Sequence, residues 1–329
     1  MQLKLLQIIG CPKCHESLEL TIIERAANEE IFIGLLRCNR CDGSWPIEAG
    51  IPRFVQGENY ALSFGYQWNQ FKAEQIDSIN GIRQSERRLH TETEWSQAWT
   101  TGKWVLDAGC GAGRFLEVAS RDECNVVGVD ISNAVDAAAE TLGGRPNVHL
   151  IQASIYELPF RDSAFDACYC IGVIQHTPDP GRALRALPHV LKVGGRLAVT
   201  IYERNKFTLL NGKYLLRPIT RRMNPKTLLT IIRVVMPILW PITEILFRIP
   251  VVHRLFRFAI PVANYVGDFE LSWKQRYRWA ILDTFDMLSP AYDQPRTQQE
   301  VEEALGSEGI VDIRRLDNGG VNLVGRKSA

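Results

Sequence analysis

The chain has 329 residues, of which 46% are hydrophobic and 23% charged, and its formal net charge is +1 at pH 7. These values fit a globular protein of about two domains, and the overall charge gives no indication of a polyanionic partner. The first ten residues lack a small-residue cleavage site before Cys11, and four of the eight cysteines form two C-x2-C pairs, so we expect a reduced cytosolic protein with one metal site, without a signal peptide or a disulfide framework.

Residues 1–56 predict a small zinc ribbon. The two C-x2-C pairs are separated by 23 residues, and apolar runs at 18–22 and 31–35 in that spacer predict two strands. Paired thiolates on two tight turns can complete a tetrahedron around zinc. The four expected ligands, Cys11, Cys14, Cys38 and Cys41, fill every position of that tetrahedron and predict a structural site.

Residues 57–100 are polar and predicted to be helical. They contain an aromatic cluster formed by Tyr60, Phe64, Tyr66, Trp68 and Phe71. The segment either packs between the ribbon and the following domain or closes over a ligand and excludes water. In the second interpretation the candidate contacts are Gln67, Trp68 and Arg83.

Residues 104–130 predict a strand, a glycine turn, a helix and a second strand. The turn is GCGAG, with Gly109, Gly111 and Gly113, and the second strand ends in Asp130. Glycines let the backbone approach a ligand closely, and an acid at the end of the next strand meets a ribose diol. A nicotinamide dinucleotide fits less well, because the third glycine of G-x-G-x-x-G is missing and Asp107 would repel a pyrophosphate. Asp107 instead favours a ligand that carries a cation and no phosphate.

The next strands place more candidates at the ligand-binding edge. A fourth strand begins near Asp166 and has Cys170 at its carboxyl end, the edge where open parallel sheets bind ligands. His176 follows on the exit loop, where it either serves as a general base or caps and packs the loop. Residues 182–195 predict a helix that ends at the Gly194-Gly195 turn, and 196–202 predict the fifth strand.

Several of these motifs occur together in one known family. Over residues 101–202, DAGCGAGRF, Asp130, FDACYCIGVIQHTPDP and LKVGGRLAVTIY resemble class I S-adenosylmethionine-dependent methyltransferases in order and spacing. The resemblance implies S-adenosylmethionine as cofactor, with its methionine and ribose lined by residues 107–113. Asp107 would interact with the ammonium through the loop, and Asp130 would accept hydrogen bonds from both ribose hydroxyls. The alternative for Asp130 is a cap at the N-terminus of the following helix, a role that Ser132 could serve equally well.

The resemblance also bears on the adenine and on the ribbon. Ile131 and Ile155 would form the apolar adenine wall. Ser154 stands where the family usually carries an aspartate, so the bond to the adenine amino group would be weaker. The string WPIEAGIPRF at 45–54 resembles the zinc-ribbon module that activates some RNA and protein methyltransferases, here fused to the chain.

Residues 204–257 are strongly basic. They contain eleven Lys or Arg and one acid, a net charge of +10 that leaves −9 for the rest of the chain. The longest charge-free run, 234–243, has ten residues and two prolines, fewer than the ~20 needed to span a bilayer. The pattern favours amphipathic helices on an anionic membrane surface. The alternatives are a helical subdomain that closes the active site, and nucleic acid, which the interleaved aliphatic residues favour less.

The last part of the chain predicts a helix at 297–310 and a hairpin formed by 311–316 and 321–326. The resemblance implies that the final strand is antiparallel and lies beside the sixth. Four side chains could face a substrate from the rim or cap the loop: Asp283, Asp286, Tyr292 and Arg296.

Together these predictions describe an α/β protein with a Rossmann-like seven-stranded methyltransferase sheet and an antiparallel last strand. The expected segments are a zinc ribbon (1–56), a helical cap or linker (57–100), the first part of the core (101–203), a basic apolar helical insertion (204–275) and the core completion with its hairpin (276–329).

The expected function is methyl transfer from S-adenosylmethionine to the hydroxyl of a small or lipid-linked acceptor, with His176 accepting the proton. An rRNA or tRNA base methyltransferase is the alternative, since ribosomal guanine methyltransferases also join a zinc ribbon to this core. A non-catalytic cofactor-binding scaffold is the third, and the intact DAGCGAG and Asp130 argue against it. We expect a cytoplasmic protein, peripheral at the inner membrane face if 204–257 contacts lipid.

Overall fold

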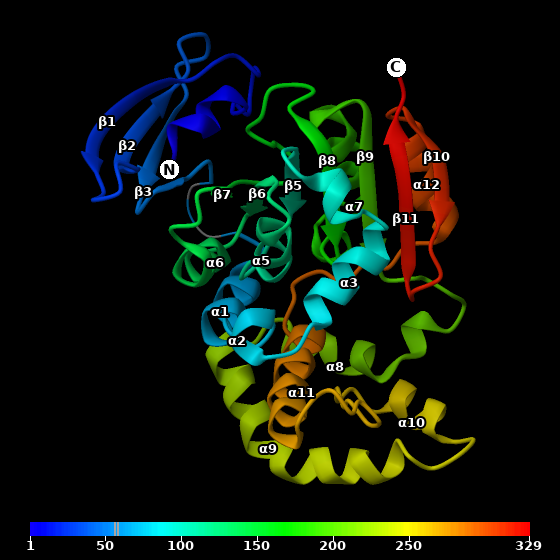
Figure 1. The fold of residues 1–329 in the computed structure, drawn as a ribbon. Helices are drawn as coiled ribbons and strands as arrows, with labels where there is room; N and C mark the ends of the chain where they lie inside the picture. The colour runs from blue at the N-terminus through cyan, green and yellow to red at the C-terminus, as the bar shows by residue number, and fades with distance from the viewer. Residues whose placement is uncertain (56, 58) are drawn as a thin grey trace.

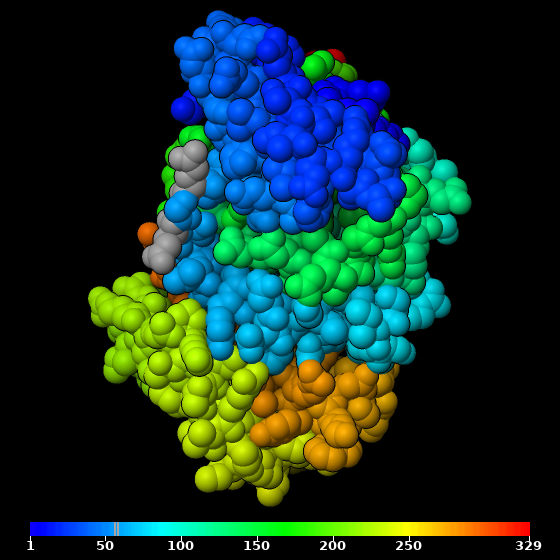
Figure 2. Space-filling model, turned by 90° about the vertical axis from the view of Figure 1, so that its left-hand side faces the viewer, coloured from blue at the N-terminus to red at the C-terminus, as the bar shows by residue number. Residues whose placement is uncertain are grey.

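The computed structural model describes residues 1–55, 57 and 59–329 (Figure 1). A small antiparallel sheet lies at one end, a large mixed sheet with flanking helices in the middle, and a helical lobe at the other end. Figure 2 shows the same order along the molecule, with the helical arm of residues 62–100 between the core and the lobe. Residue 56, which closes the first predicted segment, lies outside the described residues, and the five-segment division stays a prediction.

The small sheet has the order β1-β2-β3-β4 with every pair antiparallel. The two strands predicted between the cysteine pairs are present as β1 and β2. Ile31, Leu36 and Ile47 are fully buried in a core that also contains Phe160 of the large domain. The ribbon therefore shares its core with the large sheet. Its elements are η1 (Leu3–Gln7), β1 (Glu19–Arg25), β2 (Ile31–Arg37), β3 (Ser44–Glu48) and β4 (Ile51–Pro52).

The large sheet has seven strands in the order β10-β11-β9-β8-β5-β6-β7. β5 to β9 are parallel, whereas β11 runs antiparallel to both β9 and β10. The predicted fold class, with its reversed last strand beside the sixth, is confirmed. Its strands are β5 (Trp104–Ala108), β6 (Asn125–Asp130), β7 (Val148–Gln152), β8 (Phe165–Ile171), β9 (Leu191–Ile201), β10 (Ile310–Arg315) and β11 (Val321–Lys327).

Helices on both faces cover the large sheet, which is why its central strands read as continuous apolar runs. The helix predicted over 182–195 is wrong in its second half, because Pro188 cannot continue an α-helix and a strand begins at Leu191. The helices around the sheet are α5 (Arg114–Arg121), α6 (Ala134–Leu142), η2 (Ile174–His176), α7 (Pro180–Ala186), η3 (Leu187–Val190) and α12 (Gln298–Gly306).

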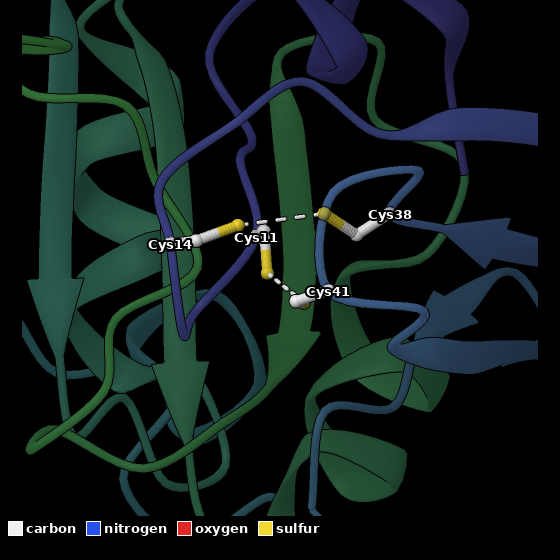
Figure 3. A group of neighbouring side chains, drawn as sticks. All are labelled: Cys11, Cys14, Cys38 and Cys41. Atoms are coloured by element: carbon white, nitrogen blue, oxygen red, sulfur yellow. Dashed lines mark hydrogen bonds between the residues drawn. The ribbon is translucent and has the colours of Figure 1, made fainter.

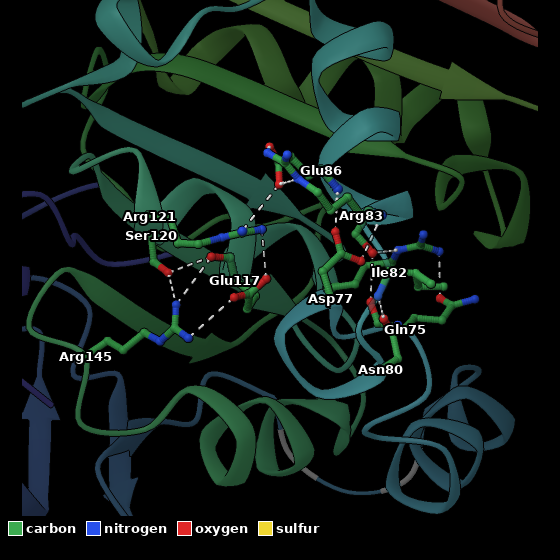
Figure 4. Close-up of polar contacts among 12 residues, drawn as sticks. Gln75, Asp77, Asn80, Ile82, Arg83, Glu86, Glu117, Ser120, Arg121 and Arg145 are labelled. Atoms are coloured by element: carbon green, nitrogen blue, oxygen red, sulfur yellow. Dashed lines mark hydrogen bonds and ion pairs between the residues drawn. The ribbon is translucent and has the colours of Figure 1, made fainter. Parts of the chain in front are cut away.

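Polar contacts hold the helical arm together and join it to the sheet domain (Figure 4). The Asp77 carboxylate accepts hydrogen bonds from the backbone N–H groups of Ser85 and Glu86 at 3.0 and 2.8 Å. Glu86 in turn pairs with Arg83 and with Arg121 of α5. The arm consists of α1 (Leu62–Gln70), α2 (Asp77–Asn80), α3 (Gln84–Thr93) and α4 (Gln97–Thr100).

The helical lobe has its own apolar core. Leu229 and Met236 of α9 are buried together with Phe285 of α11. By length and composition alone, α9 is the one helix of the described chain that could cross a membrane: its most apolar 18 residues have a mean hydropathy of 1.7, and 28% of them are buried. The lobe contains η4 (Thr208–Leu210), α8 (Gly212–Thr220), α9 (Pro225–Leu246), α10 (His253–Ala259) and α11 (Trp273–Leu288).

Candidate active site

A cavity of about 930 Å³ lies at the carboxyl ends of β5 to β9. The turns after these strands form its floor, and α1 and α3 of the arm form one wall. Helices α8, α10 and α11 of the lobe form another side. This volume is near the upper end of the range for ligand pockets, so the cavity has room for more than one ligand.

The glycine turn after β5 gives the floor its close backbone. Gly109 has φ +91°, and a Cβ there would lie 2.4 Å from Cγ2 of Val173; a Cβ on Gly111 would lie 2.9 Å from Nε1 of Trp68. A side chain at either position would therefore clash or fill the cavity. Gly113 lies away from the cavity, since its Cβ would meet Cδ1 of Leu142 on α6 at 2.7 Å. Its role is the packing of the helices behind the turn.

Asp130 stands at the end of β6 on the cavity wall. One carboxylate oxygen accepts a hydrogen bond from the Gly111 N–H at 3.0 Å, and the other accepts from the N–H and hydroxyl of Ser132 at 2.8 and 2.7 Å. Burial raises the pKa of Asp130, while these donors oppose the rise. Oδ1 already accepts two bonds, whereas Oδ2 accepts one and keeps a lone pair that can accept a bond from a ligand.

Asp107 lies beneath the turn rather than on the cavity wall. It is 2% exposed and is paired across the sheet with Tyr169 of β8. Burial raises the pKa of Asp107 well above its usual range, and the Tyr169 hydroxyl opposes that shift. Within the described chain one Asp107 oxygen has no hydrogen-bond partner. A role toward a ligand cation would act through the loop, as the resemblance implies.

The expected adenine wall is partly assembled. Ile131 and Ile155 line the cavity. Ser154 does not line it, because its hydroxyl accepts a hydrogen bond from the Tyr156 N–H at 3.2 Å. Cys170 is fully buried in β8 and also lies off the cavity. The structure thus brings two of these four candidates to the cavity.

His176 lies on the cavity wall beyond β8 and is 6% exposed. Its Nδ1 is 3.0 Å from the carbonyl oxygen of Tyr292, and because a carbonyl only accepts, Nδ1 carries the proton and Nε2 keeps its lone pair. Burial lowers the pKa of His176, and the carboxylates of Asp286 and Asp293 oppose that shift. The ring is held between Phe64 and Tyr202, with centroids 5.1 and 5.5 Å away.

Two acids of α11 reach the cavity from the lobe. Asp283 and Asp286 both line it, and Gln67 of α1 donates a hydrogen bond to Asp286 at 3.0 Å. Burial and the neighbouring Asp286 raise the pKa of Asp283 to about 7, whereas Arg114 and Arg88 oppose the shift. Of the other predicted rim residues, Tyr292 contributes its carbonyl to His176, and Arg296 pairs with Glu300 outside the cavity.

Sequence reasoning missed many polar residues of the cavity, among them Arg88, Arg114, Tyr202 and Lys213. Arg114 directly follows the glycine turn, which could have marked it; burial and Arg88 lower its pKa to about 9. Tyr202 directly follows β9 and could have been found by the same strand-end rule that pointed to Asp130. Lys213 belongs to the basic segment 204–257, and its place agrees with the alternative in which that segment closes the active site, although the sequence pattern did not single out this residue.

The arm provides part of the cover over the cavity. Trp68 lies against the glycine turn and lines the cavity. Gln67 is fully buried and acts on Asp286, as described above. Arg83 instead pairs with Glu86 at the outer surface, so it does not contact the cavity.

The four predicted metal ligands converge in the ribbon (Figure 3). The Sγ atoms of Cys11 and Cys41 are 3.4 Å apart, those of Cys14 and Cys38 are 3.5 Å apart, and all four lie within 4.8 Å of one another. A tetrahedron with Zn–S bonds of about 2.3 Å places its sulfurs about 3.8 Å apart. The cluster therefore fits a zinc ion.

Comparison with known proteins agrees with this geometry. Residues 106–199, which run from β5 into β9, match the family model described as a methyltransferase domain. The chain contains a methyltransferase domain. The glycine turn, Asp130 and His176 all belong to this methyltransferase domain, whereas Asp283 and Asp286 reach the same cavity from outside the matched segment.

The methyltransferase domain also has curated relatives. Ubiquinone biosynthesis O-methyltransferase of Alkalilimnicola ehrlichii is 33% identical over 35% of this chain and 50% of its own, and the protein of the same name from Xylella fastidiosa is 34% identical over 32% and 44%. The chain thus spans about half the length of these relatives. A solved structure of human N-acetylserotonin methyltransferase in complex with SAM covers 81% of this chain and 57% of its own at 16% identity, with a TM-score of 0.42.

Proposed function

We propose that the protein transfers a methyl group from S-adenosylmethionine to a hydroxyl of a small or lipid-linked acceptor. The observation that carries the proposal is one continuous cavity that joins the Asp130 carboxylate, at the end of β6, to His176 beyond β8. The proposed donor site and the proposed proton acceptor thus face the same space. The names of the curated relatives, O-methyltransferases of ubiquinone biosynthesis, support an oxygen acceptor.

The donor would lie over the glycine turn. Oδ2 of Asp130 would accept a hydrogen bond from one ribose hydroxyl, and the second hydroxyl would bond to Oδ1 in place of the Ser132 hydroxyl; Gly111 and the Ser132 N–H already fix the orientation of the carboxylate. Ile131 and Ile155 would hold the adenine by apolar contact, and Trp68 would close the site from above. When bound, the sulfonium supplies an electrophilic methyl group. The protein's own task is then alignment of the acceptor and exclusion of water.

His176 would take the proton of the acceptor hydroxyl. The Tyr292 carbonyl fixes the ring orientation and leaves the Nε2 lone pair available, and burial keeps the imidazole neutral at physiological pH. The proton moves to Nε2 as the hydroxyl oxygen attacks. Asp286, which accepts a hydrogen bond from Gln67, would stabilise the imidazolium that forms.

We also propose that the ribbon binds one structural Zn²⁺ through its four cysteines. The sulfur distances fit the ion, and the four ligands leave no position for substrate. The ion would tie the loops at 11–14 and 38–41 together and so preserve the surface of the ribbon that packs on Phe160. It takes no part in methyl transfer.

A lipid-linked acceptor would bring the enzyme to a membrane surface. The net charge of +10 over residues 204–257 supports contact with an anionic bilayer. In this proposal the protein is cytoplasmic and peripheral rather than embedded, because one side of α9 is packed against α11 in the lobe core.

The direct test is transfer of a tritiated methyl group from S-adenosylmethionine to separated lipid, small-metabolite and RNA extracts. The proposal expects label in the lipid or small-metabolite extract, lost in the Asp130→Asn variant. Label confined to RNA would contradict it and favour base methylation. Cofactor binding without label in any extract would favour a non-catalytic scaffold.

A further inference from the structure

Helices α8 and α10 lie side by side and expose long apolar side chains. A Cβ on Gly212, at the start of α8, would lie 2.0 Å from the carbonyl oxygen of Ala259, at the end of α10, so the two helices touch. Leu215 and Ile219 on α8 are 74% and 69% exposed, and Leu255 on α10 is 62% exposed. Single exposed apolar residues are ordinary, whereas a group on adjoining helices indicates a binding surface.

Exposed cations lie close in sequence to these apolar side chains. Arg221, Arg222 and Lys226 follow α8, and Arg254 and Arg257 lie on α10; all five are exposed. Within the described chain none of them forms an ion pair with an acid, in contrast to Lys213 and Arg217 on the inner side of α8, which pair with Asp293. Arg221, Arg222, Lys226 and Arg254 are therefore available to anionic groups of a partner, while Arg257 also lines the cavity.

The mixture of aliphatic side chains and unpaired cations fits a lipid bilayer. Leucine and isoleucine can enter the acyl boundary while arginine and lysine remain with anionic headgroups. Single-stranded nucleic acid would require exposed aromatic planes beside the cations. The exposed large apolar side chains of α8 and α10 are all aliphatic: Leu215, Leu216, Ile219 and Leu255. One exposed aromatic, Phe207, precedes α8, and a single ring does not make a stacking platform.

The inner side of the same helix pair forms part of the cavity. Lys213 of α8 and Arg257 of α10 line it. Arg217 donates hydrogen bonds to the carbonyl oxygens of Met287 and Pro290 at 3.1 and 2.9 Å, which ties α8 to the end of α11. One helix pair thus carries the exposed apolar surface and a wall of the acceptor side of the cavity.

We infer that α8 and α10 dock on an anionic bilayer with the acceptor side of the cavity turned toward the lipid. The acceptor is then an amphiphile: its polar head reaches His176, and its apolar tail stays along the α8–α10 surface or in the bilayer. The identity of the acceptor rests on the proposed methyl transfer, whereas the docking does not. It also follows that Arg257, on the cavity wall and beside the lipid, meets the polar head of the acceptor on its way in.

The docking is tested with the full chain and vesicles of phosphatidylglycerol and phosphatidylcholine. Flotation of the wild type is compared with that of a Leu215→Asp, Ile219→Asp double variant. Ile23→Asp, in which an apolar side chain of the ribbon that is 68% exposed becomes charged, is the matched control. Hydrogen–deuterium exchange on the vesicle-bound wild type then reports which segments the lipid protects.

We expect the double variant to lose at least ~10-fold in vesicle partitioning, because a carboxylate at the acyl boundary faces both desolvation and anionic headgroups. The Ile23→Asp control should float like the wild type, and protection should appear in 212–220 and 253–259. Equal flotation of the double variant, or protection confined to the ribbon, would overturn the docking.

The amphiphile is tested with the same two proteins and tritiated S-adenosylmethionine. Label should enter the lipid extract presented in vesicles and fall at least ~10-fold in the double variant, while calorimetric binding of S-adenosylmethionine stays unchanged. Label in the aqueous small-metabolite extract alone would overturn the amphiphilic acceptor and leave the proposed methyl transfer intact. Absence of cofactor binding in the wild type would instead refute the proposed function.

Discussion

Of the two ring nitrogens of His176, Nδ1 is hydrogen-bonded within the protein, and Nε2 has its lone pair available. Its Nδ1–H donates to the Tyr292 carbonyl, and the ring is buried among Phe64 and Tyr202. Burial disfavours the charged imidazolium and lowers the pKa of His176 below its usual value of 6.5. A residue in this state can accept a proton over the whole physiological range of pH.

His176→Gln should lower kcat about 10²–10⁴-fold, because the amide offers no basic nitrogen. Protonated histidine cannot act as a base, so a lowered pKa moves the acidic fall of the wild-type kcat to a pH below 6.5. A kcat–pH profile of both proteins checks this, with S-adenosylmethionine affinity as the control for folding. A fall that begins above pH 6.5, or full activity in the variant, would contradict the assignment.

At this scale the sequence predicted the floor of the site better than its walls. Strand ends and glycine turns are local features, so Gly109, Gly111 and Asp130 could be placed at one edge of the sheet. The direction of a side chain within a turn depends on its partners, which is why Ser154 fell outside the cavity. Cys170 is a strand residue of β8 whose side chain is buried in the core instead.

Helix α8 has two faces with different partners. On its inner face Arg217 is 5% exposed and donates to the carbonyls of Met287 and Pro290, next to Asp293. These bonds hold the chain that presents the Tyr292 carbonyl to His176. The inner face of α8 therefore positions the proposed base from a distance.

Arg217→Met should lower the free energy of unfolding by about 2 kcal/mol, because two buried carbonyl oxygens lose a charged donor. Urea unfolding measures the change. Arg221→Met, at the exposed end of the same helix, is the matched control and should change stability by less than about 0.5 kcal/mol. Equal effects of the two substitutions would argue against the positioning role.

Cys38→Ser should reduce zinc content from about one ion per chain to near zero, because three thiolates do not retain a structural ion in competition with a chelator. Metal analysis after dialysis against EDTA gives the readout. Cys124→Ala, which lies in the large domain, should keep its zinc. Retained zinc in the Cys38 variant would refute the four-cysteine site.

Element types followed from periodicity where the segment was long or bounded by turn residues, as in β5, α5 and β6. The helix over 182–195 was overextended because its apolar spacing continued past Pro188. The approach of α8 to the active site agrees with the predicted alternative of a helical subdomain that closes the site. The face of α8 that lines the site could not be named, since helical periodicity marks an inner face without naming the element it packs on.

Positive charge is concentrated at one end of the molecule, in the helical lobe. The ribbon and the helical lobe lie at opposite ends (Figures 1 and 2), and the +10 of residues 204–257 belongs to the lobe. A chain with a net charge of only +1 can therefore present one cationic end. This asymmetry could be read from the sequence, whereas the fold was needed to show that the lobe lies opposite the ribbon.

Binding to anionic vesicles should fall at least ~10-fold when NaCl is raised from ~0.05 to ~0.5 M, because salt screens the attraction between surface cations and headgroups. Partitioning to neutral phosphatidylcholine vesicles should be weak at both concentrations. Sedimentation of vesicle-bound protein gives both values. Binding that is tight and insensitive to salt would indicate insertion of α9 rather than surface docking.

The central claim is that the cavity beside Asp130 binds S-adenosylmethionine. Isothermal titration calorimetry of the wild type, Asp130→Asn and the exposed control Asp162→Asn tests it most directly. The account predicts about one cofactor per chain in the wild type and in the control, and an affinity about 100-fold lower in Asp130→Asn, which loses charge-assisted bonds to the ribose. No binding by the wild type, or equal affinity in Asp130→Asn, would contradict it.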